Sequence, residues 1–316
     1  MATPLVPQEI FLLERYSSVE YFAEMRDAWS AMVKHAEHCL DVFVHALPPD
    51  YRSRPLFDQP DIVWGERVLP NFRATLENLN SGFIELTHGD KEALGYAGNV
   101  SSDFAGFSRD HSSEWMAEPQ VAKHILSADE EFWRLLGQAT ERASNVNPTW
   151  GAYWRLGSLT TRFDPLYRSP LDAPPQWPTY RLNPKVRVAS SQPAPRTGIY
   201  LPDVNDSVAA LLIEGKPVVQ ASVGYDPATM QNVSLADTKW TLVERISEAG
   251  GGIPGELDPI KAGVRMRCLA GQPCPREGFW FTPARANSRR QFGVGELMSD
   301  VGGDYGVTIW QWDEQQ

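Results

Sequence analysis

Gln192-Pro-Ala-Pro-Arg-Thr-Gly198 recurs 80 residues later as Gln272-Pro-Cys-Pro-Arg-Glu-Gly278. Proline restricts φ and lacks a backbone donor, and we expect Gly198 and Gly278 to adopt conformations that other residues avoid. Each heptapeptide is therefore interpreted as a turn that leads into a strand. The copies also match on either side, at Arg187 and Arg267 and at Gly215 and Gly295. This repeat predicts two related β-modules in tandem, at about 187–246 and 264–316.

Each predicted module carries two large aromatic residues. Tyr200 and Trp280 follow the two heptapeptides, in the strand that each turn begins. Trp240 and Trp310 lie in the strands that close the modules. We expect the two aromatic side chains of a module to stack across neighbouring strands. We also expect all four to be buried, as the core of a small, bent β-structure.

The chain before these modules has the periodicity of helices. Apolar residues recur at intervals of three and four over 19–47 and over 69–86, which places them on one face of each helix. A further helix is expected within 92–107. Another begins at Ser127, where Ser127 and Glu130 have the spacing of a capping box. Antiparallel packing of these helices produces a bundle.

The predicted fold class is therefore α+β, with an N-terminal helical bundle followed by a β-rich C-terminal region made of two tandem related β-modules. We place an acidic helical domain at 1–165 and the tandem modules at 191–316. The segment between them, 166–190, is rich in proline and aromatic residues. We expect it to be a partly extended connector that packs at the domain junction.

Negative charge is concentrated in the first half of the chain. The net charge is −11, and residues 1–165 hold 24 Asp and Glu against 14 Lys and Arg. Such a domain repels nucleic acid and attracts basic proteins, although solubility alone also explains acidity. No apolar run approaches the ~20 residues of a membrane-spanning helix. Residues 1–7 lack the features of a signal peptide. We therefore expect a cytoplasmic protein that binds neither nucleic acid nor membranes.

The sequence carries no catalytic signature. Nucleophile-elbow, phosphate-loop and zinc-protease motifs are absent, so we expect no catalytic residues and no cofactor. His35, His38 and Cys39 lie within one helical turn, but no second ligand cluster accompanies them. Ordinary core and boundary roles are therefore favoured over a metal site. For Cys268 and Cys274, we favour buried free thiols over a disulfide.

The end of the chain resembles a known family. The pattern runs from Ala270-Gly-Gln-Pro-Cys-Pro-Arg-Glu-Gly-Phe-Trp-Phe-Thr-Pro-Ala284 through 292–298 and 302–306 to Trp310-Gln-Trp-Asp313. It resembles immunity proteins of bacterial polymorphic-toxin and type VI secretion systems, most closely the TsiT type, which protects against the nuclease effector TseT. The resemblance covers 195–316, and the N-terminal half only in general organisation. It implies a helical N-terminal region, a β-rich C-terminal region and no catalytic residues.

The resemblance implies a cytoplasmic immunity protein that neutralises a cognate secreted toxin, a nuclease, in a stoichiometric complex. Because a nuclease presents a basic face to its substrate, we expect acidic residues of the fourth helix to capture it. These residues are Asp129, Glu130, Glu131 and Glu141. Two alternatives stay open: a ligand- or carbohydrate-binding protein or enzyme with tryptophan-rich modules, and an adaptor of the secretion apparatus. A homodimer is compatible with each function.

Overall fold

The computed structural model describes residues 3–226, 228–254, 267–282, 285, 288–302 and 308–313. Helices occupy the first 150 residues and strands dominate after residue 179, so the predicted α+β class is confirmed. Contacts divide the chain into two compact units, of which the first contains Pro7–Gly251 and the second Gly252–Gln316. This division falls between the two β-modules. The boundaries predicted at residues 165 and 190 both lie inside the first unit.

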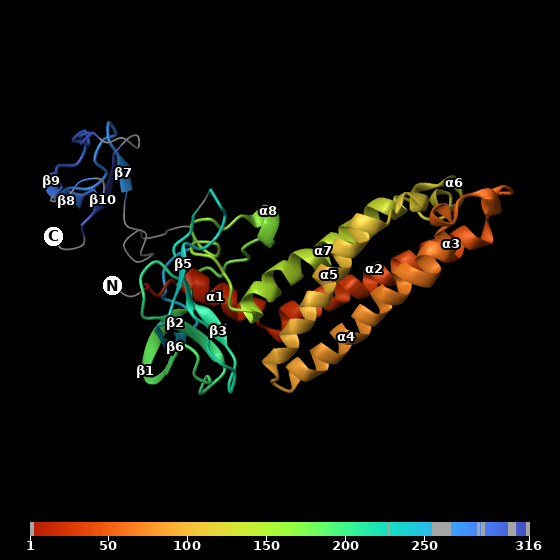
Figure 1. Ribbon diagram of the computed structural model, residues 1–316, viewed down its shortest axis with the longest axis horizontal. Coiled ribbons are helices and arrows are strands. Elements are labelled where there is room, and N and C mark those ends of the chain that lie inside the picture. The colour runs from red at the N-terminus through yellow and green to blue at the C-terminus, as the bar shows by residue number, and fades with distance from the viewer. Residues whose placement is uncertain are drawn as a thin grey trace. The chain divides into compact units, whose positions relative to one another are not determined.

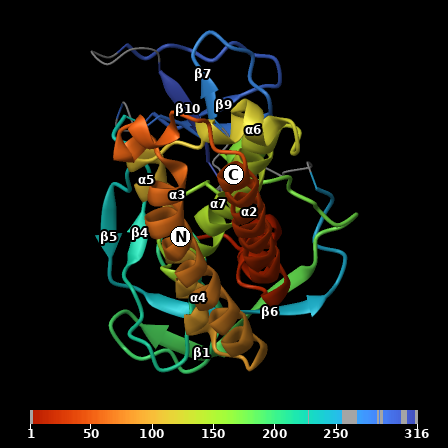
Figure 2. The same ribbon diagram turned by 90° about the vertical axis from the view of Figure 1, so that its right-hand side faces the viewer.

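The helical part of the first unit is a bundle whose long helices are joined by short helical turns. Its α-helices are α1 (Pro7–Tyr16), α2 (Val19–His45), α3 (Pro60–Val63), α4 (Leu69–Thr87), α5 (Ala97–Asp110), α6 (Pro119–Ala122), α7 (Ala128–Trp150) and α8 (Pro165–Arg168). The other turns are η1 (Tyr51–Ser53), η2 (Leu56–Asp58), η3 (Trp64–Val68), η4 (Lys91–Tyr96) and η5 (Glu114–Ala117). Helices α2, α4, α5 and α7 lie side by side (Figures 1 and 2). Among the described residues, no helix is both long and apolar enough to cross a membrane.

The apolar periodicity of the sequence places the core of the bundle. Met25 and Trp29 on α2 are completely buried, and the Trp29 indole donates a hydrogen bond to the Phe72 carbonyl of α4 at 2.9 Å. The α2 helix begins after Ser18, whose hydroxyl accepts a hydrogen bond from the Tyr21 N–H at 3.1 Å. This contact is an N-cap, which satisfies a backbone donor that the first helical turn leaves unpaired. Both helices therefore form where the apolar spacing predicts them.

The predicted capping box at the start of α7 is wrong. Ser127 adopts a left-handed conformation with φ of 52°, and its side chain makes no capping hydrogen bond. That conformation differs from the extended one in which an N-cap hydroxyl reaches the first turn. Asp129 instead accepts a hydrogen bond from Ser113, just before η5, at 2.5 Å. A tertiary contact thus replaces the local cap that the spacing of Ser127 and Glu130 indicates.

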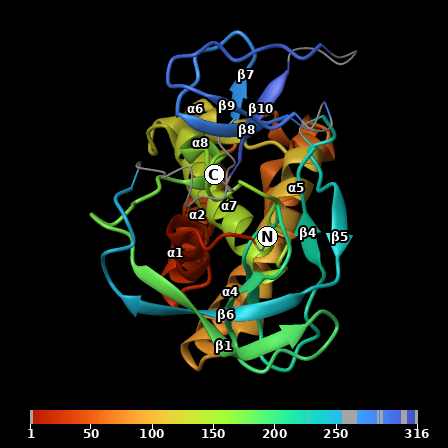
Figure 3. The same cartoon turned by 90° about the vertical axis from the view of Figure 1, so that its left-hand side faces the viewer.

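The two modules have the same strand order. The strands of the first are β1 (Thr179–Ala189), β6 (Lys239–Ser247), β2 (Gly198–Pro202) and β3 (Ala210–Leu212), in that spatial order. The strands of the second are β7 (Arg267–Leu269), β10 (Ile309–Trp312), β8 (Gly278–Phe281) and β9 (Arg290–Phe292). Neighbouring strands are antiparallel throughout, and Figure 3 shows β1 and β6 running beside each other. The first module adds a hairpin of β4 (Ala221–Val223) and β5 (Ser234–Ala236). The predicted second module includes 264–266, 283–284, 286–287, 303–307 and 314–316, which lie outside the described residues.

Backbone hydrogen bonds repeat along with the motif. In the first module the Gln192 carbonyl accepts a hydrogen bond from Val218 N–H at 2.9 Å, and in the second the Gln272 carbonyl accepts one from Met298 N–H at 2.9 Å. Each bond ties the proline-rich turn to the segment that follows the third strand of its module. The shared strand order and the shared bond support the interpretation that the modules arose by duplication.

The glycines of the repeat serve two different purposes. Gly215 and Gly295 have φ of 77° and 80°, a region that residues with a side chain rarely adopt. The prediction for Gly198 is wrong, because its φ is not positive. A Cβ there would lie 2.7 Å from a Leu242 methyl group, so a side chain at this position would have to displace that leucine. Gly278 differs from its counterpart, with φ of 150°.

Both modules are built around aromatic side chains. The four predicted ones are buried, as expected: Tyr200, Trp240, Trp280 and Trp310. The predicted stacking partners are wrong, because Trp280 meets Trp312 with ring centroids 5.3 Å apart, and Trp310 meets Phe292 at 4.9 Å. The register of β8 against β10 places Trp280 opposite Trp312, two residues beyond the expected partner. In β2 and β6, Trp240 is likewise opposite Pro202 rather than Tyr200.

The segment predicted as a connector, 166–190, contributes a full strand. β1 begins at Thr179 and pairs with β6 along its length. Pro184 lies in an irregular stretch between Asn183 and Arg187, where the register with β6 shifts. A bulge tolerates proline because its missing N–H interrupts no ladder bond. The proline content of this segment therefore marks an irregular strand as well as a connection.

Candidate functional site

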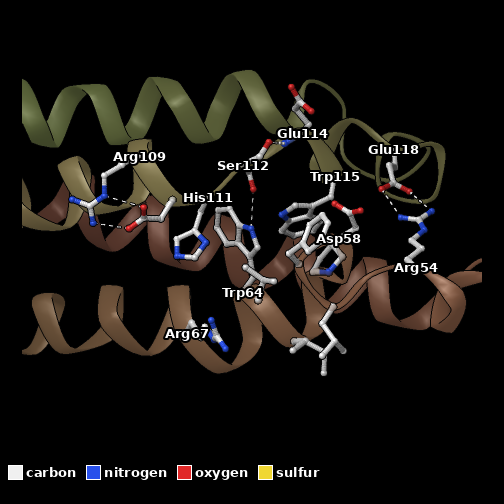
Figure 4. A pocket seen from close by; sticks show the side chains of 16 residues that line it. Arg54, Asp58, Trp64, Arg67, Arg109, His111, Ser112, Glu114, Trp115 and Glu118 are labelled. Atoms are coloured by element: carbon white, nitrogen blue, oxygen red, sulfur yellow. Dashed lines mark hydrogen bonds and ion pairs between the residues drawn. The ribbon is translucent and has the colours of Figure 1, made fainter.

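Helices α3 and α6 lie at the end of the bundle that is remote from the first β-module (Figure 1). A groove opens there (Figure 4). Its volume is about 1050 Å³. The lining residues come from 54–67, 109–115 and 118, which are far apart in the sequence. We call this feature the tip groove. Two other grooves in the described residues have smaller volumes, of about 560 and 240 Å³, and large concave surfaces are the usual location of binding sites.

A π-helical turn, η3, shapes the floor of the tip groove. The Leu69 N–H donates to the Trp64 carbonyl five residues back, one residue more than in an α-helix. Pro70 follows, and it has no N–H with which to continue the regular α-helical pattern. The widened turn accommodates this break. It directs Trp64 inward, where the indole donates a hydrogen bond to the Ser112 carbonyl at 3.0 Å (Figure 4).

Aromatic rings beneath the groove make its floor rigid. The Trp64 ring lies edge-on to Phe107, Trp115 and Phe132, each with a centroid separation of 5.3 Å. Edge-to-face contacts of this kind stabilise a fixed arrangement by about 0.5–1.5 kcal/mol each, beyond the burial of apolar area. The rings come from η3, α5, η5 and α7. The floor is therefore fixed by the packing of four separate elements.

Ion pairs form the charged part of the rim. The Arg54 guanidinium donates to both carboxylate oxygens of Glu118, at 3.0 and 3.1 Å (Figure 4). Arg109 binds Asp110 in the same two-pronged way, at 2.9 and 2.6 Å. The hydrogen bonds from Arg109 hold the pKa of Asp110 below its ordinary value. Both carboxylates are thus engaged by guanidinium groups, which suits recognition of charge better than proton transfer.

Exposed apolar side chains lie beside these charges. Leu56 and Phe57 on η2 line the groove and are 68% and 77% exposed. Arg67 also lines it, with no ion pair to any residue that the structure describes. An aromatic residue and an arginine beside a well-packed concave floor are the residue types that dominate protein interfaces. The tip groove is therefore suited to bury an apolar side chain of a partner and to pair with its charges.

The four acidic residues predicted to capture a toxin do not come together. Asp129 and Glu130 lie at the tip end of α7, whereas Glu141 lies three helical turns away, or ~18 Å along the axis. Glu131 pairs with Arg134 at 2.6 Å, which lowers the pKa of Glu131. Burial raises the pKa of Glu141, whose carboxylate accepts a hydrogen bond from a serine. Asp129 is engaged by another serine, and Glu130 is exposed.

The histidine and cysteine residues noted in the sequence occupy ordinary structural positions. His35 Nε2 lies 2.7 Å from the Ala128 backbone carbonyl at the start of α7. The Sγ atom of the buried Cys39 lies 3.6 Å from the same His35 Nε2. His38 is exposed on the same helix. Cys268 and Cys274 are both buried. In the part of the chain that the structure describes, no cluster of three or more His, Cys, Asp or Glu residues is arranged to hold a metal ion.

The tip-groove residues were not predicted from the sequence. One local signal does mark them, because the apolar pair Leu56 and Phe57 stands in a proline-rich segment, 48–60, outside the apolar stripe of either flanking helix. An apolar pair in a loop has no core-facing role that periodicity assigns. The segments 109–115 and 118 carry no comparable signal, since they join the groove only through tertiary packing.

Comparisons with protein-family models, with curated proteins and with solved structures found no match to this chain. The geometry of the molecule and the pattern of its sequence are therefore what indicates its function.

Proposed function

We propose that this protein is an immunity protein that binds a cognate secreted toxin, a nuclease, through the tip groove. The observation that carries this proposal is the exposure of Phe57, 77% accessible on the rim of a rigid aromatic groove. Large exposed side chains at such positions supply most of the binding energy in protein complexes. The resemblance of the second β-module to immunity proteins supports the same function independently.

The charges around the groove support a basic partner. Asp58 and Glu114 line the groove and are exposed, against one lining cation, Arg67, that has no ion pair among the described residues; Glu130 is also exposed, at the start of α7. The molecule as a whole carries a net charge of −11. A nuclease presents a positive face because it binds phosphates. Long-range attraction between the two would accelerate their encounter, and the apolar rim would then hold the complex.

The aromatic modules lend less support to carbohydrate binding. Sugar-binding sites use exposed aromatic faces, but Trp240, Trp280 and Trp310 are at most 2% exposed. Their role is to form the cores of the modules. The same burial leaves the tip groove as the better candidate for recognition.

Co-expression with the product of the neighbouring gene tests this function. In gene clusters of this kind the toxin gene lies beside that of its inhibitor, so the neighbouring product is the first candidate. We expect wild-type protein to co-purify with that product and to rescue cells from its toxicity. Phe57→Ser should weaken the complex by about 30-fold, corresponding to about 2 kcal/mol for a central interface residue. Leu235→Ser is the matched control, since Leu235 is 62% exposed on β5.

The outcomes separate the function from the site. If Phe57→Ser abolishes the rescue and Leu235→Ser preserves it, both parts of the proposal are supported. Rescue that both variants preserve leaves the immunity function standing but contradicts the tip groove as the interface. Absence of complex formation and of rescue by the wild-type protein contradicts the function itself.

A further inference from the structure

The arginine of the repeated motif occupies the same place in both modules, and in both its backbone carbonyl accepts a hydrogen bond from the core aromatic residue. The Arg196 carbonyl accepts a hydrogen bond from the Tyr200 hydroxyl at 2.8 Å. The Arg276 carbonyl accepts one from the Trp280 indole at 3.1 Å. Any residue can supply that carbonyl. The guanidinium groups need a separate explanation, because the two copies differ at many other positions.

In the second module a neighbouring ring explains the arginine. The Arg276 guanidinium lies 4.6 Å from the centre of the Trp312 ring, within the range of a cation–π contact. In the first module Leu242 occupies the position equivalent to Trp312, opposite the aromatic residue of the motif strand. Arg196 therefore lacks the aromatic ring that its counterpart packs against, yet the arginine is present in both copies.

Arg196 instead lines a groove within the first unit. The groove has a volume of about 560 Å³, and its walls come from α1, η4, β1, β2, β3 and β6. Four cationic side chains and two acidic ones line it: Lys91, Arg181, Arg196, Arg245, Glu14 and Glu244. Its floor includes the apolar side chains of Ile199 and Leu211. We call this feature the junction groove, and its lining is basic although the protein as a whole is acidic.

Both acidic side chains of the junction groove form ion pairs with arginines, and two of the four cationic side chains remain without an ion pair. Glu244 pairs with Arg181 at 3.2 Å, and Glu14 pairs with Arg245. The Lys91 ammonium donates to one backbone carbonyl, at 2.6 Å, and an ammonium has three donors. Within the described chain no ion pair engages Lys91 or Arg196. Glu20 acts on Lys91 and Glu244 on Arg196 only from beyond ion-pair distance, so both cations keep donors for an added anion.

The residue after the arginine distinguishes the two modules. Thr197 follows Arg196, whereas Glu277 follows Arg276. A carboxylate next to the arginine would repel an incoming anion, and a threonine does not. The first module can therefore accept an anionic ligand beside Arg196, whereas the second module has the carboxylate of Glu277 beside Arg276.

We propose that the junction groove binds an oxyanion, the phosphate or carboxylate group of a small ligand, between the Lys91 ammonium and the Arg196 guanidinium. Arginine and lysine both bind such groups through charge-assisted hydrogen bonds. The apolar floor accommodates the uncharged part of the ligand. This site is separate from the tip groove and does not depend on the proposed immunity function.

Calorimetric titration with two probes tests the proposal. Inorganic pyrophosphate represents a phosphate ligand and citrate a carboxylate ligand, and the probe that binds identifies the source of the oxyanion. We expect saturable binding of one probe, with amide NMR shifts centred on Thr197 and Gly198. Arg196→Ala and Lys91→Met should each weaken binding at least tenfold. Arg276→Ala is the matched control, because it changes the same motif position in the other module, and it should bind like the wild type.

A second variant keeps the test independent of any loss of folding. Thr197→Glu copies the sequence of the second module into the first; Thr197 is only partly buried, and a carboxylate can still accept the hydrogen bond that the Glu214 N–H donates to the Thr197 hydroxyl at 2.9 Å. We expect this variant to retain the wild-type circular dichroism spectrum and to lose probe binding. Failure of both probes to saturate overturns the proposal. The proposal is also overturned if Arg196→Ala and Thr197→Glu still bind the probe. It is overturned as well if Arg276→Ala weakens probe binding as much as Arg196→Ala does.

Discussion

Replacement of Glu9 by glutamine tests how strongly one buried carboxyl group affects stability. Glu9 lies on α1, is 5% exposed, and accepts a hydrogen bond from the Ala209 N–H of the first module at 2.7 Å. Burial raises the pKa of Glu9 from its ordinary value of 4.5 to about 7, although the bond from Ala209 opposes this change. The folded chain therefore holds the Glu9 proton more tightly than the unfolded chain does.

This difference makes the stability of the protein depend on pH. Between pH 4.5 and pH 7 the folded chain keeps the Glu9 proton and the unfolded chain has lost it, so the free energy of unfolding falls as the pH rises. At 1.36 kcal/mol per pKa unit, the complete loss amounts to about 3 kcal/mol. Glutamine keeps an oxygen that can accept the bond from Ala209 but carries no charge. Glu9→Gln should therefore escape this loss.

Urea unfolding measures the effect. Circular dichroism at 222 nm follows the helices of the first unit, and the measurement is repeated at pH 5, 6, 7 and 8. We expect the stability of Glu9→Gln relative to the wild type to increase by about 2.5 kcal/mol from pH 5 to pH 8, because part of the complete loss has already occurred at pH 5. Glu77→Gln changes an exposed carboxyl group on α4 and should follow the wild type. If the Glu9→Gln and wild-type curves run parallel over this range, the reasoning is refuted.

Three further predictions concern the core, a helix cap and the approach of a partner. Trp280→Ala should destabilise the second module by about 3–5 kcal/mol, and an unchanged thermal midpoint would mean that Trp280 lies outside its core. Ser18→Ala should cost about 1 kcal/mol in urea unfolding because it removes an N-cap, whereas Ser127→Ala should cost less than about 0.5 kcal/mol; equal losses would contradict the two cap geometries. Glu114→Lys combined with Glu130→Lys should slow toxin association about tenfold at low ionic strength in stopped-flow measurements. A rate that is insensitive to both the charges and the salt would place the interface elsewhere.

The helices were predictable because their signal is local. Trp29 and its neighbours on α2 recur at the helical period, and that period alone places them on one buried face. Ser18 acts as a cap for the same reason, since its partner N–H is three residues away. Ser127 has the same local spacing, but its conformation depends on the segment that precedes α7. Tertiary packing therefore decides between two sites that look alike in the sequence.

The modules were predictable as units, but their internal pairing was not. The repeated heptapeptide indicates two related structures, and both contain the same strand order. The contact of Trp280 with Trp312 depends on the register of β8 against β10. Register is set by long-range strand pairing, and a shift of one residue would turn every side chain to the other face. The repeat therefore predicts which residues form the core but not which of them touch.

The sequence by itself determined the α+β class, the apolar faces of the long helices and the duplication of the modules. These features arise from proline, glycine and hydrophobic periodicity, which act over a few residues. Only the tertiary structure placed Phe57 beside a floor of rings from four elements. It alone also placed Lys91 and Arg196 in one groove and enclosed Glu9 against Ala209. Each of these sites joins segments that are distant in the chain, and the packing of whole elements decides which distant segments meet.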